Sequence, residues 1–178
     1  MSGRIAACLL LVPTILLFAD PTAEEEAFLR VPHAVSPKEA DHVFDASALP
    51  PAMSDVLSGY DWRTRGGALP PQFHGFTFDL NKDGRPEYFI RTIYGGSGGP
   101  DYIILTQSDE HTWRAIGGFQ GGLRVIDTAA GWPELVTISR GGGGVWAKTH
   151  QIFRDGKYVP VFIEHYHRGV VTQEQVHE

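Results

Sequence analysis

Apolar and polar residues alternate through the second half of the chain, which predicts β-strands. From Phe73 onward, apolar positions recur at about every second residue in short runs bounded by glycine, proline or aspartate. Alternation is typical of a strand with one face on a core, and these bounding residues favour turns. The eight predicted strands cover residues 73–78, 87–94, 101–107, 112–117, 123–128, 134–140, 145–153 and 157–166. Asp155-Gly156 predicts a tight hairpin between the last two.

The pattern before Phe73 predicts short helices instead. Ser36-Pro37-Lys38-Glu39 matches a capping box with proline at the first helical position, and apolar residues follow at helical spacing. We therefore expect one helix over residues 37–44, and we also expect a second helical stretch that includes residues 53–57. Leu49-Pro50-Pro51 separates the two, because proline ends a helix.

An internal repeat of about 47 residues organises the strands. Gly84-Arg85-Pro86-Glu87 matches Gly131-Trp132-Pro133-Glu134 at an offset of 47, and each motif leads into a β-rich run that ends in glycines. Four strands per copy is the size of a propeller blade or of one sheet of a small sandwich. We predict a mainly β fold of two four-stranded antiparallel blade-like repeats, at residues 73–118 and 123–166, with a short helical N-terminal region.

The first residues predict an export signal. Arg4 precedes an apolar run from Ile5 to Phe18, and Ala19 is followed by acidic residues. This is the layout of a secretory signal peptide, and the run is shorter than a bilayer span. The expected organisation is a signal peptide at 1–19, an irregular short-helical region at 20–72, the β domain at 73–166 and a C-terminal tail at 167–178.

Charge and cysteine content narrow the class of protein. The 178 residues carry 21 acidic against 15 basic side chains, a net charge of −6, which argues against nucleic acid as a partner. Removal of residues 1–19 leaves 14 basic side chains, a charge of −7 and no cysteine. The alternative for Cys8 is lipid attachment, although almost no apolar stretch precedes it. We expect a periplasmic or secreted domain whose mature chain has no membrane span and no disulfide.

One loop carries the residues of a cation site. Residues 79–87 place oxygen-bearing side chains at loop positions 1, 3, 5 and 9 and glycine at position 6. Such a loop can wrap Ca²⁺, which takes six to eight oxygen ligands. The expected ligands of one ion are Asp79, Asn81, Asp83 and Glu87 through their side chains and Arg85 through its carbonyl. The alternative is a tight turn whose side chains accept nearby backbone N–H groups. Ile90 at position 12 excludes an EF-hand.

The loop and the strand after it resemble a known family. D-L-N-K-D-G-R-P-E-Y-F-I is similar to the calcium loop of FG-GAP and VCBS-type repeats, and Gly131–Leu135 resembles the degenerate copy that accompanies it. The resemblance covers about residues 73–160 and implies a β-rich, calcium-stabilised, non-catalytic binding module. Glu87 stands where the family more often has Asp, and Ala129 and Ala130 stand where a second set of ligands would be needed. One ion is therefore expected.

Glycine-rich loops are the expected partner surface. Gly95–Gly99 and Gly141–Gly144 close equivalent ends of the two repeats, and loops on a rigid scaffold commonly carry binding sites. The residues expected to contact a partner are Gly96, Ser97, Gly98, Gly142, Gly143, Trp132 and Trp146. The alternative is that both loops only connect strands.

Catalytic patterns are weak in this sequence. Ser97 has the glycine neighbours of a hydrolase nucleophile elbow, but Pro100 and a strand follow where that elbow needs a helix. His165 and His167, with His177, form a candidate transition-metal group, for which the alternative is a solvated tail. The remaining histidines do not assemble with an orienting acid, so we do not predict an enzyme.

These features together predict an exported, non-catalytic, calcium-stabilised binding protein. The favoured partner is another protein, as for inhibitors of wall-degrading enzymes and immunity proteins, and an acidic chain suits a basic partner. A carbohydrate- or cell-surface-binding module, with aromatic side chains near the calcium loop, is the alternative. A small hydrolase is the third class.

Overall fold

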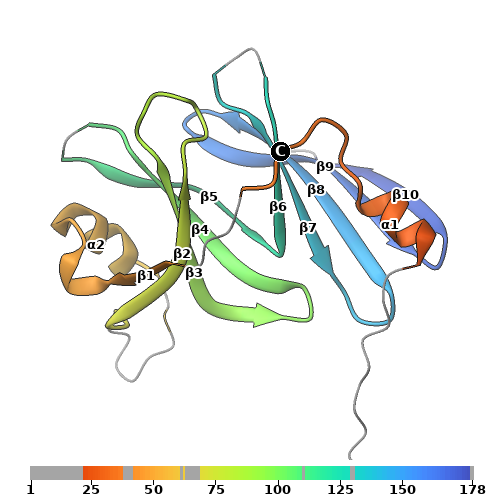
Figure 1. Cartoon of the computed structure of the whole chain (residues 1–178), viewed down its shortest axis with the longest axis horizontal. Helices are drawn as coiled ribbons and strands as arrows, with labels where there is room; N and C mark the ends of the chain where they lie inside the picture. The colour runs from red at the N-terminus through yellow and green to blue at the C-terminus, as the bar shows by residue number, and fades with distance from the viewer. Residues whose placement is uncertain are drawn as a thin grey trace, which may run out of the picture.

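The computed structural model describes residues 22–37, 42–60, 62, 69–109, 111–128 and 131–176. The predicted signal peptide lies outside these ranges. In the described part, the chain is mainly β and forms two antiparallel sheets and two α-helices (Figure 1). No helix among the described residues is long and apolar enough to cross a membrane.

Each sheet has five strands, and every strand pairs with its neighbours in sequence. The first sheet contains β1 (His42–Asp45), β2 (Gln72–Phe78), β3 (Glu87–Gly96), β4 (Gly99–Gln107) and β5 (Trp113–Gln120). The second contains β6 (Gly122–Ile126), β7 (Glu134–Arg140), β8 (Val145–Arg154), β9 (Lys157–His167) and β10 (Val170–Gln175). The helices are α1 (Ala23–Leu29) and α2 (Pro51–Ser58), with a short 3-10 helix at Ala46–Ala48.

The predicted strands are present as β2 to β9, and their ends agree with the predicted ranges within three residues. Asp155 and Gly156 have φ angles of 51° and 82°, as a tight hairpin between β8 and β9 requires. The mainly β fold is therefore confirmed.

Each sheet is larger than the predicted four-stranded unit, because a fifth strand outside the predicted repeat bounds pairs at its outer edge. On the first sheet this strand is β1, which takes the place of the end of the helix predicted over residues 37–44. Phe44 pairs with Phe73 of β2, and this tertiary pairing overrides the helical spacing of the local sequence. Residues 38–41 of that predicted helix lie outside the described part.

On the second sheet the fifth strand is β10, in place of the predicted tail. Arg168 and Gly169 form a two-residue turn with φ angles of 51° and 83°. The β-branched pair Val170-Val171 then starts a strand that pairs with β9. The C-terminal residues up to Gln175 therefore belong to the β domain.

Of the two α-helices, one was predicted from the sequence and the other was not. The helical stretch expected to include residues 53–57 is confirmed as α2. The helix α1 was not predicted, although its capping box is complete. Thr22 Oγ1 accepts a hydrogen bond from the Glu25 backbone N–H at 3.2 Å, and the Glu25 carboxylate accepts one from the Thr22 backbone N–H at 2.7 Å.

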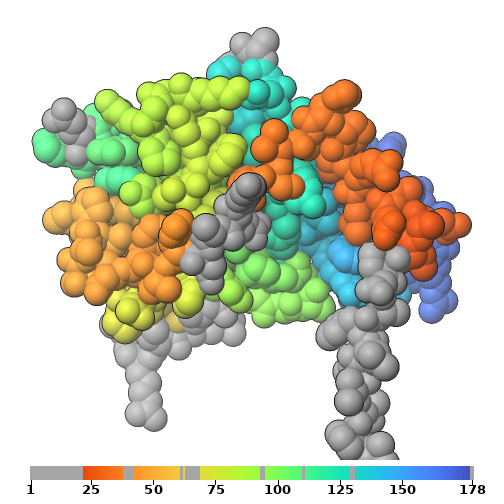
Figure 2. All heavy atoms as spheres, in the orientation of Figure 1, coloured from red at the N-terminus to blue at the C-terminus, as the bar shows by residue number. Residues whose placement is uncertain are grey.

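The core lies in two layers. One apolar cluster fills the space between the sheets and includes Phe89, Ile104 and Leu135. A second cluster joins the outer face of the first sheet to Met53 and Leu57 of α2. Figure 2 shows α1 and the segment after it spread over the second sheet.

The two repeats present opposite faces to the shared core. Tyr88 and Leu135 occupy equivalent positions, 47 residues apart. Tyr88 packs against the cluster on the α2 side, whereas Leu135 packs between the sheets. The sheets are therefore stacked front to back, which leaves two unlike outer faces. The N-terminal region covers both, with α2 on the first sheet and α1 on the second (Figure 1).

The meander sorts the loops into two ends. The aspartate end holds the loops after β2, β4, β6 and β8, and the glycine end holds those after β3, β5, β7 and β9 (Figure 1). The calcium-type loop belongs to the aspartate end, and both glycine-rich loops belong to the glycine end. The two candidate sites therefore lie at opposite ends of the sheets.

Candidate functional sites at the two ends

Backbone donors hold the calcium-type loop closed. Asp79 Oδ1 accepts a hydrogen bond from the Asp83 N–H at 3.2 Å, and its Oδ2 accepts one from the Gly84 N–H at 2.9 Å. Asp83 Oδ1 accepts one from the Arg85 N–H at 2.8 Å. Asn81 contacts Asp83 twice, since its Oδ1 accepts from the Asp83 N–H at 3.1 Å and its Nδ2 donates to Asp83 Oδ2 at 3.0 Å. The side chains at positions 1, 3 and 5 thus meet on the inner side of the loop.

Glu87 connects this loop to the core of the protein. Its side chain is buried, with 1% of the residue exposed. One carboxylate oxygen accepts the Leu80 N–H at 2.8 Å and the other accepts the Thr106 hydroxyl at 2.9 Å. Burial raises the pKa of Glu87, and these two hydrogen bonds oppose the rise only in part. Glu87 therefore ties the loop to β4 through the core.

The donor chemistry of the loop fits a hard cation. Asp79 and Asp83 supply carboxylates, Asn81 an amide and Arg85 a carbonyl, which are oxygen ligands of the kind that Ca²⁺ takes. Within the described residues, no three His, Cys, Asp or Glu side chains are grouped so as to hold a metal ion. The loop set thus contains two carboxylates, and Glu87 joins it only by giving up part of its bonding in the core.

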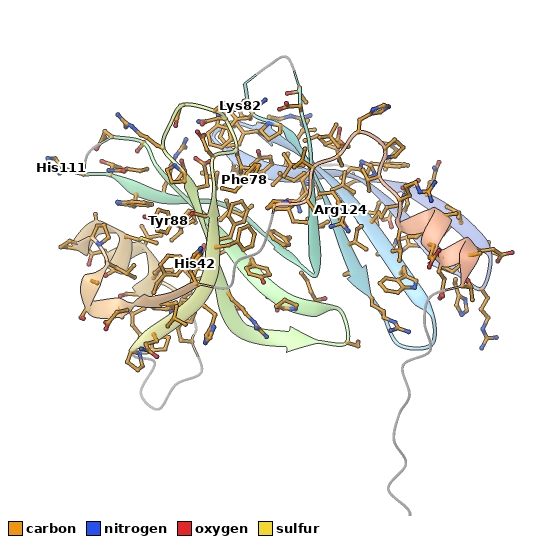
Figure 3. The ribbon with its side chains drawn as sticks, in the orientation of Figure 1. His42, Phe78, Lys82, Tyr88, His111 and Arg124 are labelled. Atoms are coloured by element: carbon orange, nitrogen blue, oxygen red, sulfur yellow. The ribbon has the colours of Figure 1, made fainter. Side chains whose placement is uncertain are left out.

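The corresponding loop of the second repeat is closed by aromatic packing. Trp132 stacks on Phe153 with ring centroids 4.1 Å apart and meets Tyr158 edge-on at 6.1 Å. Asp127 pairs with Lys82 of the first loop, whose side chain lies at the aspartate end (Figure 3). Trp132 therefore lies away from the other predicted partner-binding residues. Ala129 and Ala130 lie outside the described part.

A pocket of about 280 Å³ lies at the glycine end, where the first glycine loop meets the second sheet. Ser97 and Gly98 line one side, and Arg140 and Trp146 line the other. The Arg140 guanidinium lies 5.1 Å from the Trp146 ring centroid. Trp146 Nε1 donates a hydrogen bond to Glu25 Oε1 of α1 at 3.2 Å. Two sheets and a helix therefore fix this pocket.

Glycine is required where the two sheets meet. Gly121 is the one residue between β5 and β6, and its φ is 89°. A Cβ at this position would lie 2.0 Å from the Ile138 carbonyl oxygen and 2.8 Å from that of Gly98. Any side chain here would separate the sheets and open the pocket.

The other predicted loop residues lie close by. Gly142 and Gly143 are exposed in the turn that follows Arg140, and a Cβ at either would meet no atom within 4 Å. Gly96 lines a separate pocket of about 530 Å³ on the first sheet. The structure thus brings Ser97, Gly98 and Trp146 together, with Gly142 and Gly143 beside them.

Acidic residues border the same end. Glu24 and Glu25 at the start of α1 line a pocket of about 490 Å³ together with Gly144 and Arg168. A hydrogen bond from the Thr22 backbone N–H lowers the pKa of Glu25, which keeps this carboxylate ionised.

A ladder of charged side chains that was not predicted lies on the outer face of the second sheet. His150 Nδ1 lies 2.6 Å from Glu134 Oε1, and Lys148 Nζ lies 2.8 Å from Glu164 Oε2. Glu134 is therefore the orienting acid that the sequence did not assign to His150. The length of the turn between the strands predicted at 134–140 and 145–153 would have placed these residues near each other.

Among the described residues, the C-terminal histidines are not part of a group of side chains that could hold a metal ion. His165 Nε2 lies 3.7 Å from Glu174 Oε2 of β10, and His167 is exposed. His177 lies outside the described residues.

The geometry defines a class of protein, a two-sheet antiparallel β protein with a helix over each outer face and a pocket where the sheets meet. Comparisons with known protein families, with curated protein sequences and with solved structures find no match. Its function is therefore argued from its own residues.

Proposed function

We propose that this chain is an exported, non-catalytic binding protein that recognises another protein through its glycine end and is stabilised by calcium at its aspartate end. The observation that carries the proposal is the pocket where Ser97 and Gly98 of the first sheet face Arg140 and Trp146 of the second.

The residue types at this pocket favour protein recognition. Arginine and tryptophan are enriched among the few residues that carry most of the energy of a protein interface. The contact between Arg140 and the Trp146 ring, with the bond from Trp146 to Glu25, orders these side chains before a partner binds. Prior ordering reduces the entropy lost on association. The open backbone at Gly142 and Gly143 allows a partner to approach closely.

Charge favours a basic partner. The chain has a net charge of −6, and the acidic run Glu24-Glu25-Glu26 starts α1 beside the glycine end. A negative patch next to a binding pocket increases the association rate of a cationic partner and weakens in salt. This is the charge relation expected of an inhibitor or immunity protein that acts on a basic enzyme.

Calcium has a structural role in this proposal. Asp79, Asn81, Asp83 and the Arg85 carbonyl would hold the ion, with Glu87 behind them. When bound, Ca²⁺ would cross-link the loop in place of hydrogen bonds within it. Because this loop lies at the opposite end from the pocket, the ion would stabilise the scaffold without contacting the partner.

The test is a comparative capture with immobilised mature chain and periplasmic or secreted proteins of the source cell. We expect one stoichiometric protein on the wild type, released by salt and reduced at least tenfold by Trp146→Ala. Val43→Ala, at a position that is 55% exposed on β1, is the matched control and should retain it. Equal capture by the Trp146 variant would refute the proposal, as would no specific capture by the wild type.

A further inference from the structure

A further pocket lies between the sheets, and it shares no lining residue with the pocket of the proposed protein site. It is a groove of about 340 Å³ between β5 and the inner face of β7, β8 and β9. Its hydrogen-bonding side chains are Gln120, Thr137, Ser139, Thr149 and Gln151, and its aromatic side chains are Phe119 and Tyr158. Most of this inner face packs as apolar core, so the polar section is distinct from its surroundings.

Two polar side chains of the groove are already paired, since the Thr137 hydroxyl donates to the Thr149 carbonyl and the Tyr158 hydroxyl donates to the Pro133 carbonyl. The others have no partner among the described residues. Gln151 is 6% exposed, yet its amide makes no hydrogen bond to another described residue, and the same holds for the Ser139 and Thr149 hydroxyls. Among the described residues, the Gln151 amide atoms are not fully enclosed by protein. Because Gln151 lines the groove, its amide faces this open space. A buried amide without a partner is unfavourable unless water or a ligand bonds to it.

The register of the strands directs these groups to one side. Thr149 pairs with Thr137, and Gln151 pairs with Leu135, which packs between the sheets. Thr149 and Gln151 therefore face the first sheet. Ser139 lies two residues from Thr137 on β7 and shares that face, because side chains alternate along a strand.

The lining selects a neutral ligand. The described residues that line the groove include no Asp, Glu, Lys, Arg or His, so a charged ligand would lose hydration without gaining a counter-charge. Hydroxyls and carboxamides donate and accept at once, which suits a ligand whose own groups are hydroxyls. The Phe119 and Tyr158 rings provide apolar surface for carbon-bound hydrogens.

We infer that this groove binds a neutral saccharide unit. Its volume falls in the range of small-molecule sites and accommodates a ligand of one or two sugar rings. Gln151 and Thr149 would bond the ligand hydroxyls from the second sheet, and Gln120 would bond them from β5.

The test is a chemical-shift titration of the ¹⁵N-labelled chain with maltose, cellobiose and N,N′-diacetylchitobiose, and with glucuronate as the charged comparator. We expect saturable shifts with at least one neutral sugar, confined to β5, β7, β8 and β9, and weaker binding of glucuronate. Gln151→Met should weaken the binding about tenfold, the effect of one lost hydrogen-bonding group. Gln175→Met, on exposed β10, is the matched control and should leave it unchanged.

Three results would overturn the inference. The first is the absence of saturable shifts with every neutral sugar, which would identify a hydrated groove only. The second is equal binding of glucuronate, and the third is unchanged sugar affinity in Gln151→Met. If Gln151→Met fails to fold, Ser139→Ala takes its place in the same comparison, because it removes one hydroxyl from a half-buried position. Trp146→Ala separates the two sites, since it should reduce protein capture at least tenfold and leave the sugar shifts intact.

Discussion

The two sheets use their outer faces differently. The outer face of the first sheet meets α2 in a continuous apolar cluster, in which Met53 and Leu57 are completely buried. The outer face of the second sheet meets α1 chiefly at Phe28 and carries the ladder of Lys148, His150 and Glu164. Related repeats can thus hold unlike outer faces when each face has its own cover. The outer face of the first sheet is part of the core, and the outer face of the second is polar and partly open.

The largest expected effect on the free energy of unfolding is a difference between truncating α2 on the first sheet and truncating α1 on the second. Leu57→Ala should lower the free energy of unfolding by about 3 kcal/mol, because the deletion leaves a cavity in a closed core. Phe28→Ala should lower it by about 1.5 kcal/mol, because water can enter under α1 and mainly the transfer free energy is lost. Urea denaturation of both variants gives the comparison. A larger loss from Phe28→Ala would contradict it.

The next effect compares equivalent glutamates of the two repeats. Glu87→Gln should lower the free energy of unfolding by about 1–3 kcal/mol, because an amide N–H₂ would face the donor of Leu80 or Thr106 in the core. Glu134→Gln should lower it by less than about 1 kcal/mol, because its side chain is 29% exposed. Chemical denaturation at neutral pH measures both, and equal losses would show that the two sites are equally enclosed.

A smaller effect compares the two aspartate-end loops. At a Kd of about 10⁻⁴ to 10⁻³ M, millimolar Ca²⁺ should stabilise the chain by about 0.4–1.4 kcal/mol relative to EDTA. Asp83→Ala should abolish this shift, whereas Asp127→Ala in the second loop should keep it. Calorimetric melting temperatures with Ca²⁺ and with EDTA provide the measurement. An unchanged melting temperature of the wild type would remove calcium from the proposal.

The smallest effect is an opposite response to pH. Burial raises the pKa of Glu87, so its contribution favours folding at low pH and is lost as the pH rises through the folded pKa. Burial by itself would raise the pKa of Glu164, but the hydrogen bond and the positive charge of Lys148 outweigh burial, so the pKa is lowered. The Glu164 contribution is therefore present above the unfolded value of 4.5 and is lost as the pH falls through the folded pKa.

Stability measured from neutral pH to about pH 3 tests these signs. The stability difference between wild type and Glu87→Gln should widen toward acid pH, and that between wild type and Glu164→Gln should narrow. The same trend in both variants would contradict the assigned causes.

Local patterns predicted the parts of the fold that depend on neighbouring residues. Alternation located β2 to β9, and Asp155-Gly156 located a hairpin, because both signals act within a few residues. The strand β1 depends on the pairing of Phe44 with Phe73, across a long separation in sequence, and local helical spacing pointed elsewhere. Pairing of this kind is decided by tertiary contacts.

The sites divide in the same way. The loop over residues 79–87 was visible as a motif, and the position of both glycine loops at one end follows from the meander. The meeting of Ser97 with Trp146 depends on how the sheets stack, which no local pattern encodes. The stacking of Trp132 on Phe153 likewise depends on contacts that the Trp132 motif does not show.

The one-residue connection at Gly121 has a consequence for folding kinetics. Strands β2 to β5 and strands β6 to β10 each pair with the strand next to them in sequence, so these parts of the two sheets can form hairpin by hairpin from local contacts, which favours rapid folding. Docking of the two sheets then closes almost no loop, because Gly121 alone joins β5 to β6 and the entropy of loop closure is small. Gly121→Ala should therefore act on the docking step and leave the formation of the individual hairpins unchanged.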